Sequence, residues 1–224
     1  MLRNRVFKLI GAKAEDRYID FRSTIYGGAI QENRSTLKRG TLMEKQNPII
    51  ETKRLILREV TFEDALDMYH YLSDEEVVKH MGLAPAQNVE DVLDEIEWYH
   101  SIITEGTGIR WGITLKDSGK VIGSCGYLNL QDKHYRAEVG FELSKNYWGK
   151  GIASEALGAI IRYGFNHYQL ERIEALIEPG NIQSQKLVSK LGFTKEGLLR
   201  HYEYTLGKFD DLYMYSIIKS DLIK

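Results

Sequence analysis

The stretch Glu138-Val-Gly-Phe-Glu-Leu-Ser-Lys-Asn-Tyr-Trp-Gly-Lys-Gly-Ile-Ala-Ser-Glu155 decides how this chain folds, because its residue pattern changes from that of a strand to that of a helix. From Arg136 to Leu143, apolar and polar residues alternate, which is the period of a half-buried strand. From Gly151 onward, apolar residues recur three and four positions apart, which predicts a helix with one face packed on the sheet. The stretch therefore predicts a strand, a short loop and a helix in direct succession.

Two glycines, Gly149 and Gly151, lie where the loop meets the predicted helix. The first N–H groups of a helix have no partner inside it and carry a partial positive charge, and glycine lets a ligand come close to the backbone. The junction therefore suits an anion. It lacks the Gly-Lys-Ser/Thr ending of a P-loop, and Ser154 replaces the third glycine of the dinucleotide fingerprint. A plain glycine turn is the alternative, since short glycine motifs match by chance.

A family resemblance favours an anion-binding loop, and a phosphate group in particular, over a plain glycine turn. Residues Asn146 to Ala153 resemble the pyrophosphate loop of the GCN5-related N-acetyltransferases (GNAT family), in the form found in the ribosomal-protein N-terminal acetyltransferase branch. Asn146 stands where Arg or Gln is usual, which matters little if backbone N–H groups hold the ligand. Other blocks similar to the family's follow in the expected order, so that the resemblance covers residues 48–222: Thr52–Arg58, Asn181–Ser184, Leu191–Phe193, Glu196–Gly197 and Gly207–Tyr215.

The resemblance implies an α+β protein with the GNAT fold, in which a mixed sheet of six to seven strands is flanked by about four helices. Residue patterns predict helices that begin near 61, 88, 151 and 181, and strands at 54–59, 110–115, 120–130, 136–143, 172–178, 198–204 and 211–218. We expect the inner face of the first helix to carry Leu66, Tyr69, His70 and Leu72.

The resemblance also implies acetyl-CoA as co-substrate, without a metal. In the family, backbone N–H groups of the glycine loop hold the pyrophosphate, and the pantetheine arm enters between two strands that diverge, here those at 136–143 and 172–178. Asn181 is expected to bond the arm, and its competing role is to cap a helix. The expected coenzyme-binding residues are Phe141, Glu142, Leu143, Trp148, Gly149, Lys150, Gly151, Ile152, Ala153, Asn181 and Ser184.

Acetylation of an amine needs a neutral amine, a polarised thioester carbonyl and a proton for the departing thiolate. Glu203 is the first candidate for the base, because its segment resembles the one that carries the catalytic glutamate in ribosomal-protein acetyltransferases, and Glu138 is the second. A solvated surface glutamate is the alternative for each. The family's usual acidic tyrosine is replaced by Val188. By resemblance to the ribosomal-protein branch, in which a serine of Asn-x-x-Ser lies near the sulfur, Ser184 is expected to polarise the thioester. The alternative is a serine that satisfies a helix start.

The resemblance implies an acyltransferase that acetylates a primary amine directly, with a protein N-terminal α-amine as the preferred acceptor. A small amine, such as a polyamine, an amino acid or an antibiotic, is the alternative acceptor. A non-catalytic acyl-CoA-binding module is the alternative outside enzymes. An exposed edge in the last strand pair would also suit a homodimer.

Composition bounds these interpretations. Of 224 residues, 43% are hydrophobic and 28% charged, which is ordinary for a soluble protein, and no apolar run suits a membrane helix. Residues 43–224 hold 21 Lys/Arg and 28 Asp/Glu, which argues against nucleic acid and favours a basic or amine-bearing partner. A solvated acidic surface is the commoner explanation for such a balance. The single cysteine, Cys125, is expected to be buried in a strand, and its isolation fits the cytoplasm.

Residues 1–42 differ from the rest of the chain. They hold nine Lys/Arg and four Asp/Glu, and Ser23 to Gly40 shows no sustained period. Met43 directly precedes the first family-like block. We therefore expect residues 1–42 to be a dispensable, poorly ordered extension, such as a mis-assigned start codon would add, and residues 43–224 to be the acetyltransferase domain.

Overall fold

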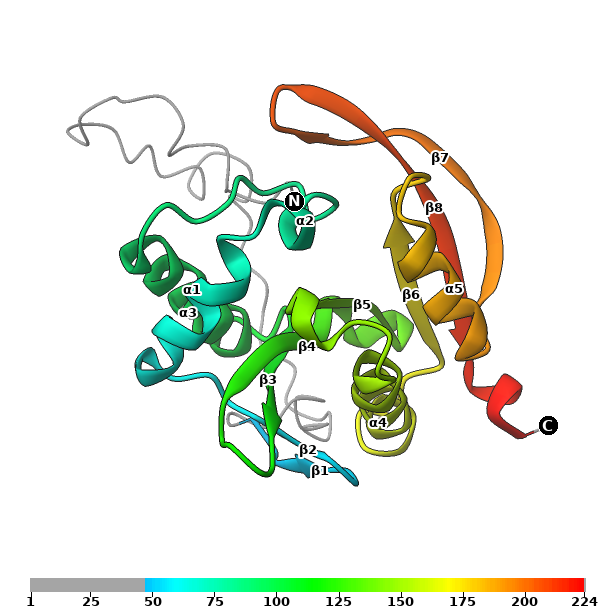
Figure 1. Ribbon diagram of the computed structural model, residues 1–224. Helices are drawn as coiled ribbons and strands as arrows, with labels where there is room; N and C mark the ends of the chain where they lie inside the picture. Colours follow the sequence, from blue (N-terminus) through cyan, green and yellow to red (C-terminus); the bar gives the residue numbers. More distant parts are fainter. Residues whose placement is uncertain (1–46, 224) are drawn as a thin grey trace, which may run out of the picture. The chain divides into compact units, whose positions relative to one another are not determined.

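A computed structural model describes residues 47–223, and the predicted extension at residues 1–42 lies outside them. These described residues form a mixed sheet of eight strands in the order β1-β2-β3-β4-β5-β6-β8-β7 (Figure 1). Every neighbouring pair is antiparallel except β5 and β6, which are parallel. The strands are β1 Ile50–Glu51, β2 Leu55–Arg58, β3 Ile109–Leu115, β4 Val121–Gln131, β5 Arg136–Leu143, β6 Arg172–Ile177, β7 Thr194–Thr205 and β8 Lys208–Ile218.

Five α-helices accompany the sheet in the described part of the chain. Asn88 caps α3 by accepting a hydrogen bond from the N–H of Asp91, and Asn181 caps α5 in the same way from the N–H of Ser184. The helix that begins near 88 and the capping role of Asn181 agree with the sequence analysis. The helices are α1 Ala65–Leu72, α2 Glu75–Val78, α3 Val89–Thr104, α4 Ile152–Asn166 and α5 Ile182–Lys190.

Two apolar cores lie on opposite faces of the sheet. The larger contains α4 and the apolar side of β5, including Ala137 and Val139. The smaller contains α1 and α3, and it reaches β4 through Val121. Side chains of a strand alternate between faces, so the polar positions of β5 point to the α3 side. That side is where the candidate acceptor chemistry collects.

The predicted fold class is confirmed, and so are the strand at 136–143 and the helix after Gly151. The sheet has more strands than the six to seven expected, because β1 is too short to predict. The inner face of α1 was predicted only in part: Leu72 is buried and Tyr69 is half-buried, but Leu66 and His70 are exposed, whereas Met68 and Tyr71 are buried. Cys125 is buried as predicted, and burial raises its thiol pKa to about 12.

Candidate active site

Strands β5 and β6 pair over three residues only, from Arg136 to Glu138 on β5. Beyond Glu138 they diverge, although β5 continues to Leu143 and stays paired with β4 on its other side. The predicted divergence is therefore present. It leaves backbone polar groups of residues 139–143 without a strand partner in the middle of the sheet, where an extended ligand can bond them as an added strand would. The Leu143 carbonyl is already engaged, because it accepts from the Trp148 indole N–H at 2.7 Å.

The glycine loop presents a row of free backbone donors next to this opening. Gly149 and Gly151 have φ of 73° and 74°, a left-handed conformation that glycine adopts without strain. Within the described residues, the N–H groups of 149–153 donate to no acceptor, whereas the N–H of Trp148 donates to the carbonyl of Lys145 at 3.1 Å. Five of the six predicted donors are therefore free to bind an anion.

Arg54 and Glu155 hold the loop in place. The carboxylate of Glu155, in the first turn of α4, accepts from the hydroxyl of Thr52 at 2.7 Å and from the Arg54 guanidinium at 2.7 Å. A second nitrogen of that guanidinium donates to the Lys150 carbonyl at 2.9 Å. The pKa of Glu155 is lowered, because these hydrogen bonds outweigh its partial burial. The start of β2 thereby fixes the start of α4.

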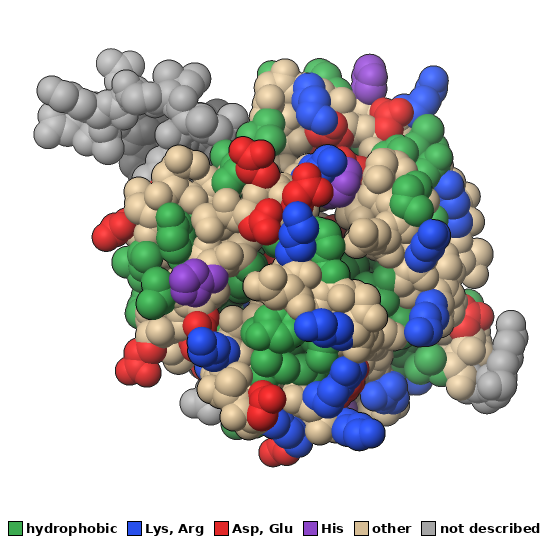
Figure 2. Space-filling model, in the orientation of Figure 1, with side chains coloured by type: hydrophobic (Ala, Val, Ile, Leu, Met, Phe, Trp, Pro, Cys, Tyr) green, Lys and Arg blue, Asp and Glu red, His purple; other side chains and the backbone are tan. Residues whose placement is uncertain are grey.

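Exposed cations surround this side of the domain. Figure 2 shows Lys and Arg side chains gathered over α4 and α5. The exposed cations of these helices and of the loop before α4 are Lys145, Lys150, Arg162, Lys186 and Lys190. A phosphate-bearing ligand meets favourable charge here, although the domain as a whole is acidic.

Asn181 and Ser184 lie together at the start of α5. The side-chain oxygen of Asn181 accepts from the Ser184 N–H at 3.1 Å, so the capping role is present. The Asn181 amide nitrogen and the Ser184 hydroxyl have no hydrogen-bond partner among the described residues. Capping thus leaves the amide donors and the hydroxyl available to a ligand.

Glu138 and Glu203 lie on different strands of the sheet. Glu138 is half-buried on β5 and accepts from the Asn129 amide at 2.8 Å. Glu203 is half-buried on β7, opposite Asp210 of β8. Tyr202 lies in the bulge of β7 just before Glu203. Its pKa is raised first by partial burial and then by the charges of Glu138, Glu174 and Glu203.

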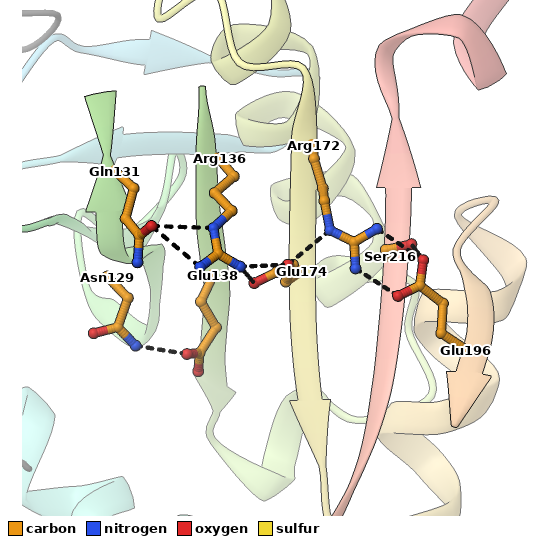
Figure 3. A network of polar contacts seen from close by, with 8 residues as sticks. All are labelled: Asn129, Gln131, Arg136, Glu138, Arg172, Glu174, Glu196 and Ser216. Atoms are coloured by element: carbon orange, nitrogen blue, oxygen red, sulfur yellow. Dashed lines mark hydrogen bonds and ion pairs between the residues drawn. The ribbon is translucent and has the colours of Figure 1, made fainter. Parts of the chain in front are cut away.

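A ladder of charges crosses the sheet beside Glu138 (Figure 3). Arg136 donates to Glu174 at 3.0 Å, Arg172 donates to Glu174 at 2.7 Å, and Arg172 donates to Glu196 at 2.7 Å. The Arg172 hydrogen bonds, with one from Ser216, lower the pKa of Glu196 to about 2. The ladder holds β5, β6, β7 and β8 in register next to the opening.

Glu142 departs from the expected pattern. Alternation assigns it to the polar side of β5, yet it is buried and forms an ion pair with Arg110 of β3. Ser124 of β4 donates to the same carboxylate, and the Tyr99 hydroxyl of α3 donates to it at 3.1 Å. Burial alone would lower the pKa of Arg110, but the Glu142 carboxylate raises it. Helix α3 therefore covers a buried charged cluster beneath the backbone of 141–143.

Two contacts close the rim of this face. The imidazole of His80, in the loop after α2, lies 2.7 Å from the Glu178 carboxylate at the end of β6. A Cβ added at Gly82 would lie 2.8 Å from the Thr205 methyl group at the tip of the β7–β8 hairpin. The loop after α2, the end of β6 and the hairpin tip therefore meet around the polar face of β5.

The sequence analysis did not single out Arg110, Arg54 or Tyr202. Arg110 carried a signal, since it is the one charged residue in the otherwise apolar or small stretch Gly108–Leu115. Arg54 and Tyr202 stand in family-like blocks but outside the positions taken as functional. Their roles depend on contacts made by residues far apart in the chain.

The residues that the structure describes contain no group of three or more His, Cys, Asp or Glu arranged to hold a metal ion. None of their helices is long and apolar enough to cross a membrane.

The chain was compared with known proteins. The family model for the acetyltransferase (GNAT) domain matches residues 54–194. The N-acetyltransferase p20 of Bacillus licheniformis is 44% identical over 76% of this chain and 96% of its own length. The [ribosomal protein uS5]-alanine N-acetyltransferase of Escherichia coli is 29% identical over 72% of this chain and 86% of its own length. The structure of Mycobacterium smegmatis RimJ in complex with CoA-disulfide shares the fold, with a TM-score of 0.71. The two sequences are 22% identical, and the match covers 80% of this chain and 91% of that one.

Proposed function

This chain belongs to the GNAT acetyltransferase family, and from that premise we propose that it transfers the acetyl group of acetyl-CoA directly to a protein N-terminal α-amine. The enzyme class, an N-acetyltransferase, follows from the family and from its relatives. The donor and the acceptor are the proposal. The observation that carries it is the side of β5 that has no strand partner beyond Glu138, next to the free N–H groups of the glycine loop.

The donor side fits acetyl-CoA through its backbone. The free N–H groups of 149–153 suit a pyrophosphate at a helix start, and the exposed Lys and Arg over α4 and α5 suit the other phosphates. The edge at Phe141–Leu143 suits the amide groups of the pantetheine arm. The amide nitrogen of Asn181 remains available to the same arm after its oxygen has capped α5.

The acceptor side provides candidates for the proton transfers. Glu203 is the first candidate for the base and Glu138 the second, and each is a half-buried carboxylate on the sheet. An α-amine with a pKa near 7.7–8.0 needs less help from a base than a lysine near 10.4. Ser184 is proposed to donate a hydrogen bond to the thioester carbonyl or sulfur.

The preference for a protein N-terminus rests on two observations. The Escherichia coli relative acetylates an alanine of ribosomal protein uS5, according to its name. The segment His201 to Tyr204 resembles the one that carries the catalytic glutamate in ribosomal-protein acetyltransferases. The acidic carboxylates around Tyr202 suit any amine, so a small amine is the competing acceptor.

The test is release of free thiol from acetyl-CoA by the full chain, with peptides that begin with Ser or Ala and with a panel of polyamines, amino acids and amine-bearing antibiotics. Turnover that is fastest with the peptides supports the proposal. Turnover with a small amine and none with the peptides contradicts the proposed acceptor. Tight binding of acetyl-CoA without release in either panel contradicts the proposed transfer to these amines.

A further inference from the structure

The Arg110 side chain lies across the sheet on the α3 side, over two glycines. In the register of the sheet, Arg110 of β3 is opposite Gly126 of β4, and Gly126 is opposite Gly140 of β5. A Cβ at Gly126 would lie 2.9 Å from the Arg110 Cδ, and a Cβ at Gly140 would lie 2.8 Å from its Nη1. The two glycines thus provide the space that brings the guanidinium to β5.

The guanidinium is held firmly through two of its three nitrogens. Nε donates to the Ser124 hydroxyl at 3.1 Å, and Nη2 donates to that hydroxyl and to Glu142. The Tyr99 ring lies 5.2 Å from the centre of the group. Arg110 is 5% exposed, so its position is set by packing as well as by charge. A planar group fixed in this way has little freedom to turn its third nitrogen elsewhere.

That third nitrogen, Nη1, has no partner. Its two N–H donors bond to no atom within the part of the chain that the structure describes. Nη1 is not one of the fully buried polar atoms that lack a partner, so it reaches solvent, and a ligand can replace water there. Nη1 lies over Gly140, which is only half-buried and stands two residues beyond Glu138, where the pairing of β5 with β6 ends.

We propose that Arg110 Nη1 donates a hydrogen bond to the carbonyl oxygen of the acceptor's first residue and thereby selects amines that carry a neighbouring carbonyl. The inference rests on the proposed function, because the acceptor amine must approach the thioester beside Gly140 when the coenzyme arm lies along 141–143. In an N-terminal residue the carbonyl oxygen is three bonds from the reacting nitrogen. A polyamine or an alkylamine has no oxygen there.

The chemistry of the position favours a neutral carbonyl over other groups. A guanidinium can only donate, so it repels an ammonium and cannot accept from an amine. Its charge is largely compensated by Glu142, and Glu138 lies on the same face of β5, so an acidic ligand would meet a carboxylate as well. A neutral acceptor with lone pairs satisfies Nη1 without adding charge to the site.

The experiment compares alaninamide with isopropylamine, which keeps the amine and the branched carbon but lacks the carbonyl. For the full chain, the KM for alaninamide is expected to be lower than that for isopropylamine. Arg110→Lys keeps a cation for Glu142 but removes Nη1. It is expected to raise the KM for alaninamide roughly 10- to 100-fold, while the KM values for isopropylamine and acetyl-CoA change little.

Gly140→Ala is the second variant, because its Cβ pushes Nη1 aside without changing any charge. It is expected to raise the KM for alaninamide selectively, even if Arg110→Lys fails to fold. Gly158→Ala is the matched control: its Cβ would lie at an ordinary 3.5 Å from an Arg162 nitrogen on α4, and no kinetic change is expected.

Equal effects of Arg110→Lys and Gly140→Ala on alaninamide and isopropylamine, or no effect on either, would overturn the role of Arg110 while the proposed function stands. If the unaltered chain turns over only amines without a carbonyl, the proposed acceptor is itself wrong, and the role of Arg110 falls with it. The behaviour of the unaltered chain thus separates the two failures.

Discussion

The donor side and the acceptor side of this site are built in different ways. The donor side consists of backbone groups from one continuous stretch, the end of β5, the glycine loop and the start of α4. The acceptor side consists of side chains from β3, β5, β6 and β7, which lie far apart in the sequence. A backbone site tolerates changes of side chain, whereas the acceptor side depends on each residue and each buried pair.

The largest expected effect is on the buried pair beneath the acceptor side. Glu142→Ala leaves the Arg110 guanidinium buried without its carboxylate, which is expected to lower the free energy of unfolding by about 3–5 kcal/mol. Urea denaturation measures it. Glu51→Ala, which removes an exposed partner of Lys116, is the control and should leave the midpoint nearly unchanged. Equal midpoints for both variants would show that the pair contributes no stability.

The next effect is on catalysis. Glu203→Gln removes the first candidate for the base, which is expected to lower turnover roughly 100-fold, mainly at lower pH, where the amine is protonated and depends on a base. The pH dependence of kcat measures it, with Glu138→Gln as the parallel variant. If Glu203→Gln leaves the profile as it is and Glu138→Gln changes it, the base is Glu138.

The donor side should respond to backbone changes and resist side-chain changes. Gly151→Ala forces a side chain into φ of 74°, which costs about 1–2 kcal/mol and shifts the free N–H groups. We expect the KM for acetyl-CoA to rise about tenfold, since 1.4 kcal/mol is a factor of ten. Lys150→Ala keeps every N–H and should change that KM by no more than about threefold. A larger rise in this KM for Lys150→Ala than for Gly151→Ala would mean that side chains hold the pyrophosphate.

The smallest expected effect concerns acid stability of the charge ladder. The folded-state pKa of Glu196 is lowered to about 2, so its stabilisation is complete above the ordinary carboxyl pKa near 4.3. It is lost as the pH falls from about 4.5 to about 2. Denaturation at several pH values should show that the free energy of unfolding of Glu196→Gln falls less steeply over this range than that of the unaltered chain. The difference is expected to be small, because the Glu196 side chain is 40% exposed. Identical pH dependence of the free energy of unfolding in the two proteins would show that Glu196 does not contribute to acid stability.

The donor side and the acceptor side also differ in how much of each could be predicted from the sequence. The residue pattern predicted the strand β5 and the helix α4 on which the proposed donor side is built, because the residues that determine them are close together in the chain. Burial of Glu142 was not predictable, because its position on β5 has the pattern of an exposed residue and its partner Arg110 precedes it by 32 residues. The bulge that carries Tyr202 likewise depends on the pairing of β7 with β8.

The central claim, transfer to an α-amine, is tested most directly by one peptide that carries both an N-terminal alanine and an internal lysine. After incubation with the full chain and acetyl-CoA, fragment-ion mass spectrometry locates the acetyl group. The account predicts acetylation of the N-terminal nitrogen. Acetylation of the lysine side chain, or none on the peptide while a polyamine in the same mixture is acetylated, would contradict it.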